Sequence, residues 1–245
     1  MPILGYNQTK KSDAQMLEKY MREGTFIEVN LGDIRNESEL EYLISVFVKF
    51  NALHEDIEEV EEFLNFKERV IDALEKEAVY IGMRVVDGWS EFYFYSKESK
   101  GIEQKIASIF SGSGYVYETS IIRDNKWNFY YKNLFPSDLE MYLIYSKKIV
   151  LQMMAEGDNL EVPREVEHYV SFDTASQKER FLKSIDKIGF RYKDDVDNKE
   201  LAHAVAITKE HSLDQDSLEK NISELLELIK KDHGRYELWS APLVQ

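Results

Sequence analysis

In the first half of the chain, hydrophobic residues alternate with polar ones in some stretches and recur at helical spacing in others. Alternation predicts a half-buried strand, whereas a spacing of three or four residues predicts an amphipathic helix. Asp87-Gly88 lies between two alternating stretches and is a hairpin signal. The predicted elements in order are a strand (Tyr42–Phe50), a helix (Glu55–Leu74), two strands (Val79–Val86 and Glu91–Tyr95), a helix (Gly101–Phe110) and a strand (Tyr115–Ile122).

The second half repeats this order. Thr174 and Gln177 form a capping-box pattern that begins a helix, and apolar residues from Leu218 to Ile229 form the stripe of another. Two of the predicted strands flank an acidic stretch, Asp194–Asp197, which we expect to be a loop. The elements are a strand (Glu165–Phe172), a helix (Thr174–Ile188), two strands (Phe190–Lys193 and Leu201–Thr208), a helix (Asp216–Gly234) and a strand (Tyr236–Leu243).

An order of β-α-β-β-α-β is typical of the split βαβ arrangement, in which two helices cover a four-stranded sheet. The sequence therefore predicts an α+β protein of two tandem ferredoxin-like modules. The first is extended by an N-terminal helix (Lys10–Glu23) and strand (Thr25–Leu31). Asp138–Met154 is expected to be a connecting helix, and the short, polar segment Gly157–Pro163 is the linker candidate. The predicted domains are residues 1–156 and 164–245.

The 46 acidic residues outnumber the 31 basic ones and give a net charge of −15, which argues against direct nucleic-acid binding. This acidity supports solubility, or it attracts a basic protein partner. There is no cysteine, which fits a reducing compartment, and no apolar run approaches the roughly 20 residues of a membrane span. The N-terminus has no apolar core of signal-peptide length. We expect a cytoplasmic protein that does not bind membranes.

No motif for catalysis or cofactor binding stands out. None of the five histidines has another within four residues, so no zinc pattern forms, and His203 is expected to be a hydrogen-bonded core or edge residue. Gly112-Ser113-Gly114 leads into a strand rather than a helix, so it is not a phosphate loop. Adjacent carboxylates such as Glu58-Glu59 are interpreted as solvated faces. We predict no enzyme, no cofactor and no metal site, with an unrecognised carboxylate and histidine site as the alternative.

The three tryptophans are either core residues or anchors of an interface. Trp127 lies in an aromatic-rich segment, which favours the core. Trp89 follows a turn glycine and Trp239 lies in the last predicted strand, and for these two the choice is more open.

The stretch from about Tyr42 to Pro136 resembles the bacterial domain-of-unknown-function family 695. Its most specific parts are the "FYFY" strand and the Asp-x-x-Trp motif that precedes Leu134, Phe135 and Pro136. The resemblance implies a domain boundary and no mechanism.

The stretch from about Val166 to Val244 resembles the regulator of ribonuclease E activity B. The resemblance lies in "HYVSFDTASQKERFLKSIDKIGFRY" and in the ending that contains His233, Gly234, Tyr236 and Trp239. It implies an acidic ferredoxin-like protein that binds the endoribonuclease and inhibits RNA turnover. The expected partner-binding residues are Asp194, Asp195, Asp197, Tyr236 and Trp239, with the aspartates close to exposed aromatic rings such as that of Trp239.

The function predicted from the sequence is therefore a non-catalytic regulator that binds a basic protein such as a ribonuclease E-like enzyme. An immunity-type protein that neutralises a toxin would use the same electrostatics. A homo-oligomer also stays open, because sheet edges and faces of such modules often pair.

Overall fold

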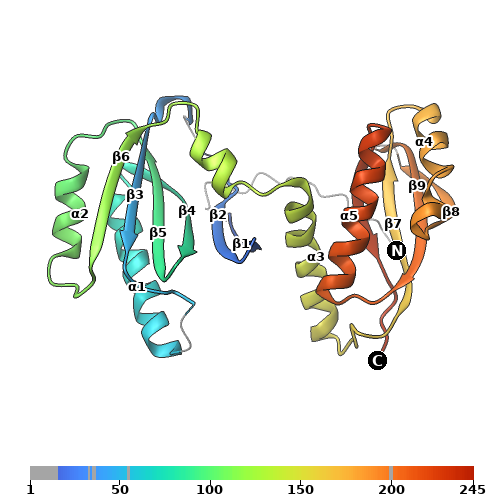
Figure 1. The fold of residues 1–245 in the computed structure, drawn as a ribbon, viewed down its shortest axis with the longest axis horizontal. Coiled ribbons are helices and arrows are strands. Elements are labelled where there is room, and N and C mark those ends of the chain that lie inside the picture. The colour runs from blue at the N-terminus through green and yellow to red at the C-terminus, as the bar shows by residue number, and fades with distance from the viewer. Residues whose placement is uncertain (1–15, 33, 35–36, 54–55, 199–200) are drawn as a thin grey trace. The chain divides into compact units, whose positions relative to one another are not determined.

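The computed structural model describes residues 16–245, apart from residues 33, 35–36, 54–55 and 199–200. The chain divides into two compact units, Met1–Phe135 and Pro136–Gln245, each with its own sheet (Figure 1). No helix among the described residues is long and apolar enough to cross a membrane. The structure thus confirms a mixed α and β protein built on two antiparallel sheets.

The first unit contains a six-stranded antiparallel sheet in the order β1-β2-β4-β5-β3-β6. Its alternating sequences explain the pairing, because each strand turns one row of apolar side chains toward the helices. The strands are β1 (Leu17–Arg22), β2 (Thr25–Asn30), β3 (Tyr42–Val48), β4 (Ala78–Val86), β5 (Trp89–Ser96) and β6 (Tyr117–Arg123). A short 3-10 helix, η1 (Glu37–Glu39), precedes β3.

Two helices cover one face of this sheet, α1 (Ile57–Leu74) and α2 (Ile102–Phe110) (Figure 1). Their apolar stripes, with Phe63 and Ile106 fully buried, pack on alternate residues of the strands. The opposite face is covered by the segment after β6, which includes a π-helical turn, η2 (Tyr130–Leu134). In this segment the Trp127 ring stacks on Tyr95 at 4.0 Å and is 2% exposed, so the predicted core position of Trp127 is confirmed.

The helix predicted at Lys10–Glu23 is wrong where the structure describes it, because Leu17–Arg22 is the strand β1. Residues 10–15 lie outside the described part. β1 forms a hairpin with β2 through Glu23 and Gly24, both at positive φ, as tight turns require. The Tyr20 hydroxyl also donates to the Leu134 carbonyl at 2.7 Å. Cross-strand pairing and this distant contact therefore override a local pattern that fitted a helix.

The second unit contains a four-stranded antiparallel sheet in the order β10-β7-β9-β8. In both units the first strand of the β-α-β-β-α-β pattern lies between the third and the fourth. The strands are β7 (Arg164–Ser171), β8 (Arg191–Asn198), β9 (Leu201–His211) and β10 (Arg235–Ser240), and the helices are α3 (Asp138–Ala155), α4 (Ala175–Leu182), η3 (Ile185–Ile188) and α5 (Gln215–Lys231). The helices share one apolar core with one face of the sheet.

The helix α3 packs on the second sheet rather than acting only as a connection. It begins directly after Pro136 at a Ser137 capping box, and Tyr142 meets Tyr236 edge to face at 4.9 Å. The indole N–H of Trp239 donates to the buried Ser146 hydroxyl at 2.8 Å. The units consequently divide between Phe135 and Pro136, whereas the sequence placed α3 in the first domain and the linker at Gly157–Pro163.

The acidic stretch Asp194–Asp197 is not a loop, because β8 continues through it to Asn198. Register shifts after Tyr192 and after Val196 accommodate additional residues in the ladder with β9. β8 is an edge strand, so its carboxylates stay exposed to water while its backbone pairs on one side only.

One buried ion pair lies between the first sheet and α1. Glu28 on β2 accepts from the Lys67 ammonium and from the Tyr80 hydroxyl, both at 2.8 Å, and all three residues are at most 3% exposed. Lys67 holds the pKa of Glu28 below its usual value against the opposing effect of burial. Removing one member of such a pair leaves a buried charge without its partner, which costs about 3–5 kcal/mol.

Gly82 permits β2 and β4 to approach each other beside this ion pair. It has a φ of +150°, and a Cβ atom there would lie 2.3 Å from the backbone oxygen of Glu28. We therefore expect Gly82→Ala to lower the free energy of unfolding by about 3 kcal/mol or more. Gly88→Ala is the matched control, because Gly88 also has positive φ but no atom lies within 4 Å of its added Cβ, so about 1 kcal/mol is expected. Urea unfolding of the first unit measures the free energy of unfolding of both variants. Equal losses in Gly82→Ala and Gly88→Ala would contradict the steric explanation.

Candidate functional site

The predicted partner-binding residues lie at opposite edges of the second sheet. Asp194, Asp195 and Asp197 are exposed on the edge strand β8, whereas Tyr236 and Trp239 belong to the other edge strand, β10. Tyr236 is 3% exposed and Trp239 is 2% exposed. The expectation that the aspartates lie near an exposed Trp239 is therefore wrong. The strand order separates the two groups, and α3 covers the tryptophan.

The aspartates differ in the hydrogen bonds and ion pairs that they form with neighbouring residues. Asp195 forms an ion pair with Lys178 of α4 at 3.0 Å and accepts from the Tyr192 hydroxyl at 3.2 Å. The bond from Lys178 lowers the pKa of Asp195. Asp194 accepts from the backbone N–H of Asp195 at 2.8 Å, so its carboxylate stays at the surface. Asp194 is thus better placed than Asp195 to meet a partner.

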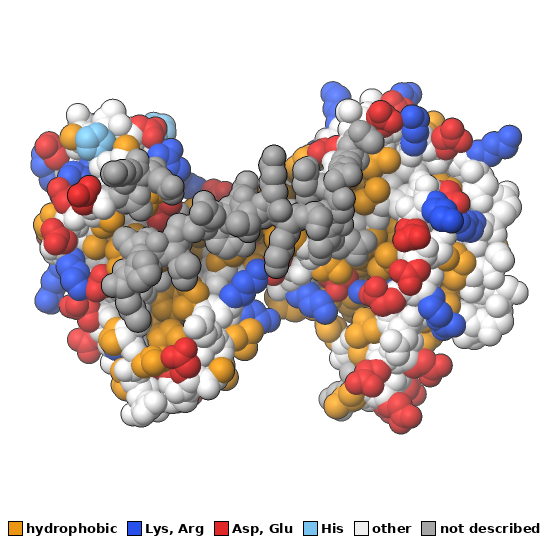
Figure 2. All heavy atoms as spheres, turned by 180° about the vertical axis from the view of Figure 1, so that it is seen from behind, with side chains coloured by type: hydrophobic (Ala, Val, Ile, Leu, Met, Phe, Trp, Pro, Cys, Tyr) orange, Lys and Arg blue, Asp and Glu red, His pale blue; other side chains and the backbone are white. Residues whose placement is uncertain are grey.

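Further carboxylates lie on the sheet face that turns away from the helices. Glu165 on β7 pairs directly with Glu210 on β9, and both are exposed. Like charges opposite each other in a sheet are destabilising, and here Lys193 of β8 offsets them by pairing with Glu165 at 3.7 Å and with Glu167. We call Glu165, Glu210, Asp194 and Asp197 the acidic strip. On the face that Figure 2 shows, acidic, basic and hydrophobic side chains are interspersed across the described surface.

A chain of hydrogen bonds joins three buried residues on the other face of the same sheet. His168 on β7 bonds through Nδ1 to the Tyr236 hydroxyl at 2.8 Å and through Nε2 to Nε2 of His211 at 3.0 Å. His211 bonds through Nδ1 to the backbone oxygen of Ser212 at 2.7 Å. His168 is 0% exposed and His211 is 7% exposed.

The acceptor at Ser212 fixes the protons of this chain. A carbonyl only accepts, so His211 carries its proton on Nδ1 and accepts through Nε2. His168 then donates from Nε2, and its Nδ1 accepts from the Tyr236 hydroxyl. Every link is satisfied with both rings neutral. A second proton on His211 would place its Nε2–H against the Nε2–H of His168, whereas a second proton on His168 would require the Tyr236 hydroxyl to accept instead of donate.

The electrostatic surroundings also favour neutral rings. Burial lowers the pKa of His168 well below its usual value, and the nearby His211 and Lys209 act in the same direction. The pKa of His211 is lowered mainly by burial, while the Ser212 carbonyl opposes that effect. Burial raises the pKa of Tyr236, so its hydroxyl remains a donor at neutral pH. The chain is thus a structural network rather than a set of groups poised for proton transfer.

The sequence missed the roles of His168 and His211, although a signal was present. Val166, His168 and Val170 alternate along β7, and His168 pairs in register with Ile207. That parity places the ring in the apolar core. The histidine expected in a core or edge position, His203, is instead exposed near the beginning of β9 and has a φ of +44°.

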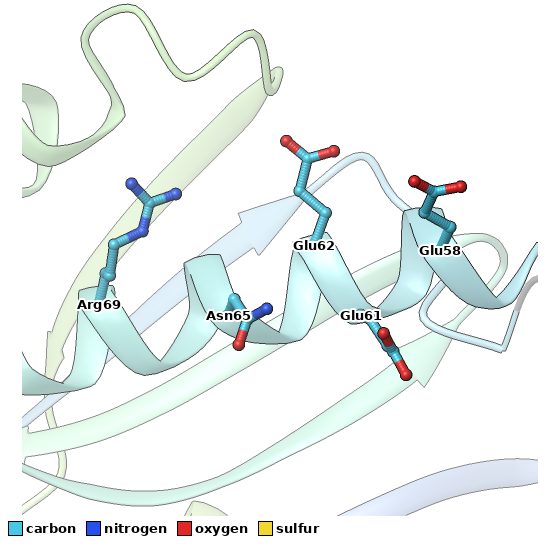
Figure 3. A pocket seen from close by; sticks show the side chains of 5 residues that line it. All are labelled: Glu58, Glu61, Glu62, Asn65 and Arg69. Carbon is cyan, nitrogen blue, oxygen red and sulfur yellow. The ribbon is translucent and has the colours of Figure 1, made fainter.

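An open hollow lies along the exposed side of α1 in the first unit (Figure 3). It has a volume of about 610 Å³ and is lined by Glu58, Glu61, Glu62, Asn65 and Arg69. These side chains come from a single helix and project in different directions, with Glu61 turned away from Glu58 and Glu62 (Figure 3). The hollow does not enclose a substrate. Among the described residues, no three histidine, aspartate or glutamate side chains gather as a metal site would require.

The fold and its surface define a protein of two α and β units whose buried polar groups serve packing and whose exposed charges are mainly acidic. Residues 143–241 match the family model described as regulator of ribonuclease activity B. Residues 22–135 match the model of a family of unknown function, DUF695. Each match falls within one unit, and both resemblances found in the sequence are confirmed. Each unit is thus similar to a different family, the first to DUF695 and the second to the regulator of ribonuclease activity B.

Other comparisons add little. No curated protein matches the sequence. One solved structure, titled the crystal structure of an unknown protein from Galdieria sulphuraria, shares 12% sequence identity with this chain. The match covers 83% of this chain and 99% of that one, with a TM-score of 0.24. A similarity at this level carries no argument about fold or function.

The neutral histidine chain predicts a pH dependence of stability in the second unit. Unfolded histidines bind protons below about pH 6.5, whereas the folded rings resist protonation. The free energy of unfolding therefore reaches its full value above that pH and declines as the pH falls. From pH 6.5 to 5.5 we expect a loss of about 1 kcal/mol for each histidine that stays neutral. Urea unfolding of the second unit over this range measures the slope.

The variant His211→Gln should reduce that slope by about half, since one titrating group is removed. His233→Asn is the matched control, because His233 is exposed and asparagine tolerates its positive φ. If the slope in His211→Gln equals that of the unchanged protein, the buried hydrogen bonds of His168 and His211 are not the cause of the pH dependence.

Proposed function

We propose that the second unit binds a ribonuclease and lowers its activity without cleaving RNA itself. The observation that carries this proposal is the match of residues 143–241 to a family named for regulating ribonuclease activity. The order of the second sheet, β10-β7-β9-β8 with helices on one face, supports a ferredoxin-like module, and the first unit repeats that order in four of its strands.

The acidic strip is the surface we assign to this interaction. RNA-processing enzymes carry cations where they hold phosphates, and a run of exposed carboxylates is complementary to such a surface. Glu165 and Glu210 face each other on the adjacent strands β7 and β9, and Lys193 of β8 partly offsets their repulsion by pairing with Glu165. An approaching arginine or lysine would neutralise these carboxylates further. Asp194 and Asp197 extend the same charge along the β8 edge.

In this proposal the buried aromatic residues maintain the structure of the second unit. Tyr236 and Trp239 hold β10 against His168 and α3, so they shape the unit and do not touch the partner. The acidity that attracts a basic protein also repels RNA, which agrees with a regulator rather than a nuclease. A ribonuclease partner further agrees with the cytoplasmic location expected from the sequence.

Neutralising the acidic strip tests this proposal. We expect purified bacterial ribonuclease E to bind the full chain at about 50 mM salt and more weakly at about 300 mM, since exposed charges are screened. We expect Asp194→Asn with Asp197→Asn to weaken binding about fivefold or more, because each rim charge contributes up to about 1 kcal/mol. Calorimetry measures the affinity, and cleavage of a fluorescent single-stranded RNA measures inhibition.

The control pair is Glu219→Gln with Glu227→Gln, which removes the same charge from exposed positions on α5. It should leave binding and inhibition close to those of the unchanged protein. The assignment of the acidic strip fails if both pairs weaken binding equally. The proposed function itself fails if ribonuclease E neither binds nor slows at either salt concentration.

A further inference from the structure

We propose that two copies of this chain associate through β6, whose free edges pair in antiparallel fashion. β6 is the last strand of the first sheet, and its only described neighbour is β3 (Figure 1). An edge strand presents a row of backbone donors and acceptors that a second strand can satisfy. The inference concerns the first unit and is independent of ribonuclease binding.

The ladder with β3 shows which backbone groups point outward. Lys49 N–H donates to the Val116 carbonyl at 2.9 Å, and Asp124 N–H donates to the Glu41 carbonyl at 2.8 Å. The register between them continues without a shift. Because antiparallel hydrogen-bonded pairs recur every second residue, even-numbered residues of β6 face β3. The N–H and C=O groups of Tyr117, Thr119 and Ile121 therefore point away from the sheet.

The other edges carry features that oppose such pairing. β8 has two register shifts and several carboxylates, and β10 has a register shift after Tyr236. β1 has charged side chains at three of its six positions. In contrast, β6 has an uncharged run from Thr119 to Ile122, and its ladder is regular. Bulges and charges are the usual protections of an edge strand, so β6 is the least protected of the four.

Exposed apolar side chains at Ile122 of β6 and at Val116, directly before it, favour a second copy as the occupant. Tyr117 and Ile121 pack toward the helices, whereas Val116 and Ile122 are 62% and 54% exposed. We place Thr119 opposite Thr119 of the second copy, on the two-fold axis. Val116 of each copy then lies opposite Ile122 of the other copy. These are non-hydrogen-bonded pairs, in which side chains approach most closely.

The same register leaves no like charges directly opposite. Glu118 faces Ser120 of the second copy, and Tyr117 faces its Ile121. A register centred on Ser120 would instead place Glu118 opposite Ile122, which buries an apolar side chain against a carboxylate. The strand is thus complementary to itself in one register. A single strand pair forms a small interface, so the dimer should be weak and depend on concentration.

Sedimentation of the full chain from about 1 to 300 µM tests the association. We expect a reversible shift from monomer to dimer over this range. Thr119→Pro should weaken the dimer at least tenfold, since it removes an outward N–H at the two-fold axis. Proline is tolerated at such an edge position, so the chain should still fold. A monomer at every concentration would overturn the proposal.

A charge exchange tests the register. Ile122→Lys alone should weaken the dimer at least tenfold, whereas Leu151→Lys, an equally exposed position on α3, should not. Adding Val116→Glu to Ile122→Lys should restore most of the association, because each new carboxylate faces the new ammonium of the other copy. The two positions are about 20 Å apart within one strand, so they cannot compensate inside a monomer. A dimer that persists in both Thr119→Pro and Ile122→Lys would show that another surface is used. If Val116→Glu with Ile122→Lys does not restore dimer formation, the proposed register is wrong.

Discussion

The hydrogen bond from the Tyr236 hydroxyl to His168 Nδ1 ties the edge strand β10 to β7, a central strand of the second sheet. It lies inside an apolar core, where an unpaired polar group costs about 1–3 kcal/mol. This bond completes a hydrogen-bonded series whose direction the Ser212 carbonyl sets. His211 donates to that carbonyl and accepts from His168, which leaves His168 Nδ1 to accept from Tyr236. The Glu28, Lys67 and Tyr80 cluster applies the same constraint in the first unit. In each case a polar group fixes which strands and helices meet.

The periodic part of the fold could be predicted from the sequence because local pattern and tertiary packing agree there. The strands and helices from Tyr42 to Arg123 have apolar residues at the spacing of their own secondary structure, and so does α5. Predictions failed where a distant contact decided the outcome. Leu17–Arg22 is a strand because β2 and Leu134 bind it, and α3 joins the second unit because Trp239 and Tyr236 pack against it.

The candidate site was predicted only in part for a similar reason. The exposure of the carboxylates at Asp194–Asp197 follows from their charge, which the sequence contains, whereas their place on the edge strand β8 does not. Burial of Trp239 depends on α3 covering β10, which no local pattern records. The register of β7 with β9 places His168 opposite Ile207 and His211 opposite Arg164, so the bond between the two rings follows only from the three-dimensional path of the side chains. Motifs therefore identified both family resemblances, while the placement of the aromatic residues required the three-dimensional structure.

The two proposed associations use opposite physics on separate units. The acidic strip repels another acidic strip and attracts a basic protein, so it does not pair with a second copy of this chain. The β6 edge relies on backbone hydrogen bonds and two exposed apolar pairs, which salt affects little. Weak pairing through β6 would place two copies of the second unit in one assembly and raise their effective concentration toward a partner that offers more than one binding surface. On this view, the first unit brings two copies together and the second unit recognises the partner.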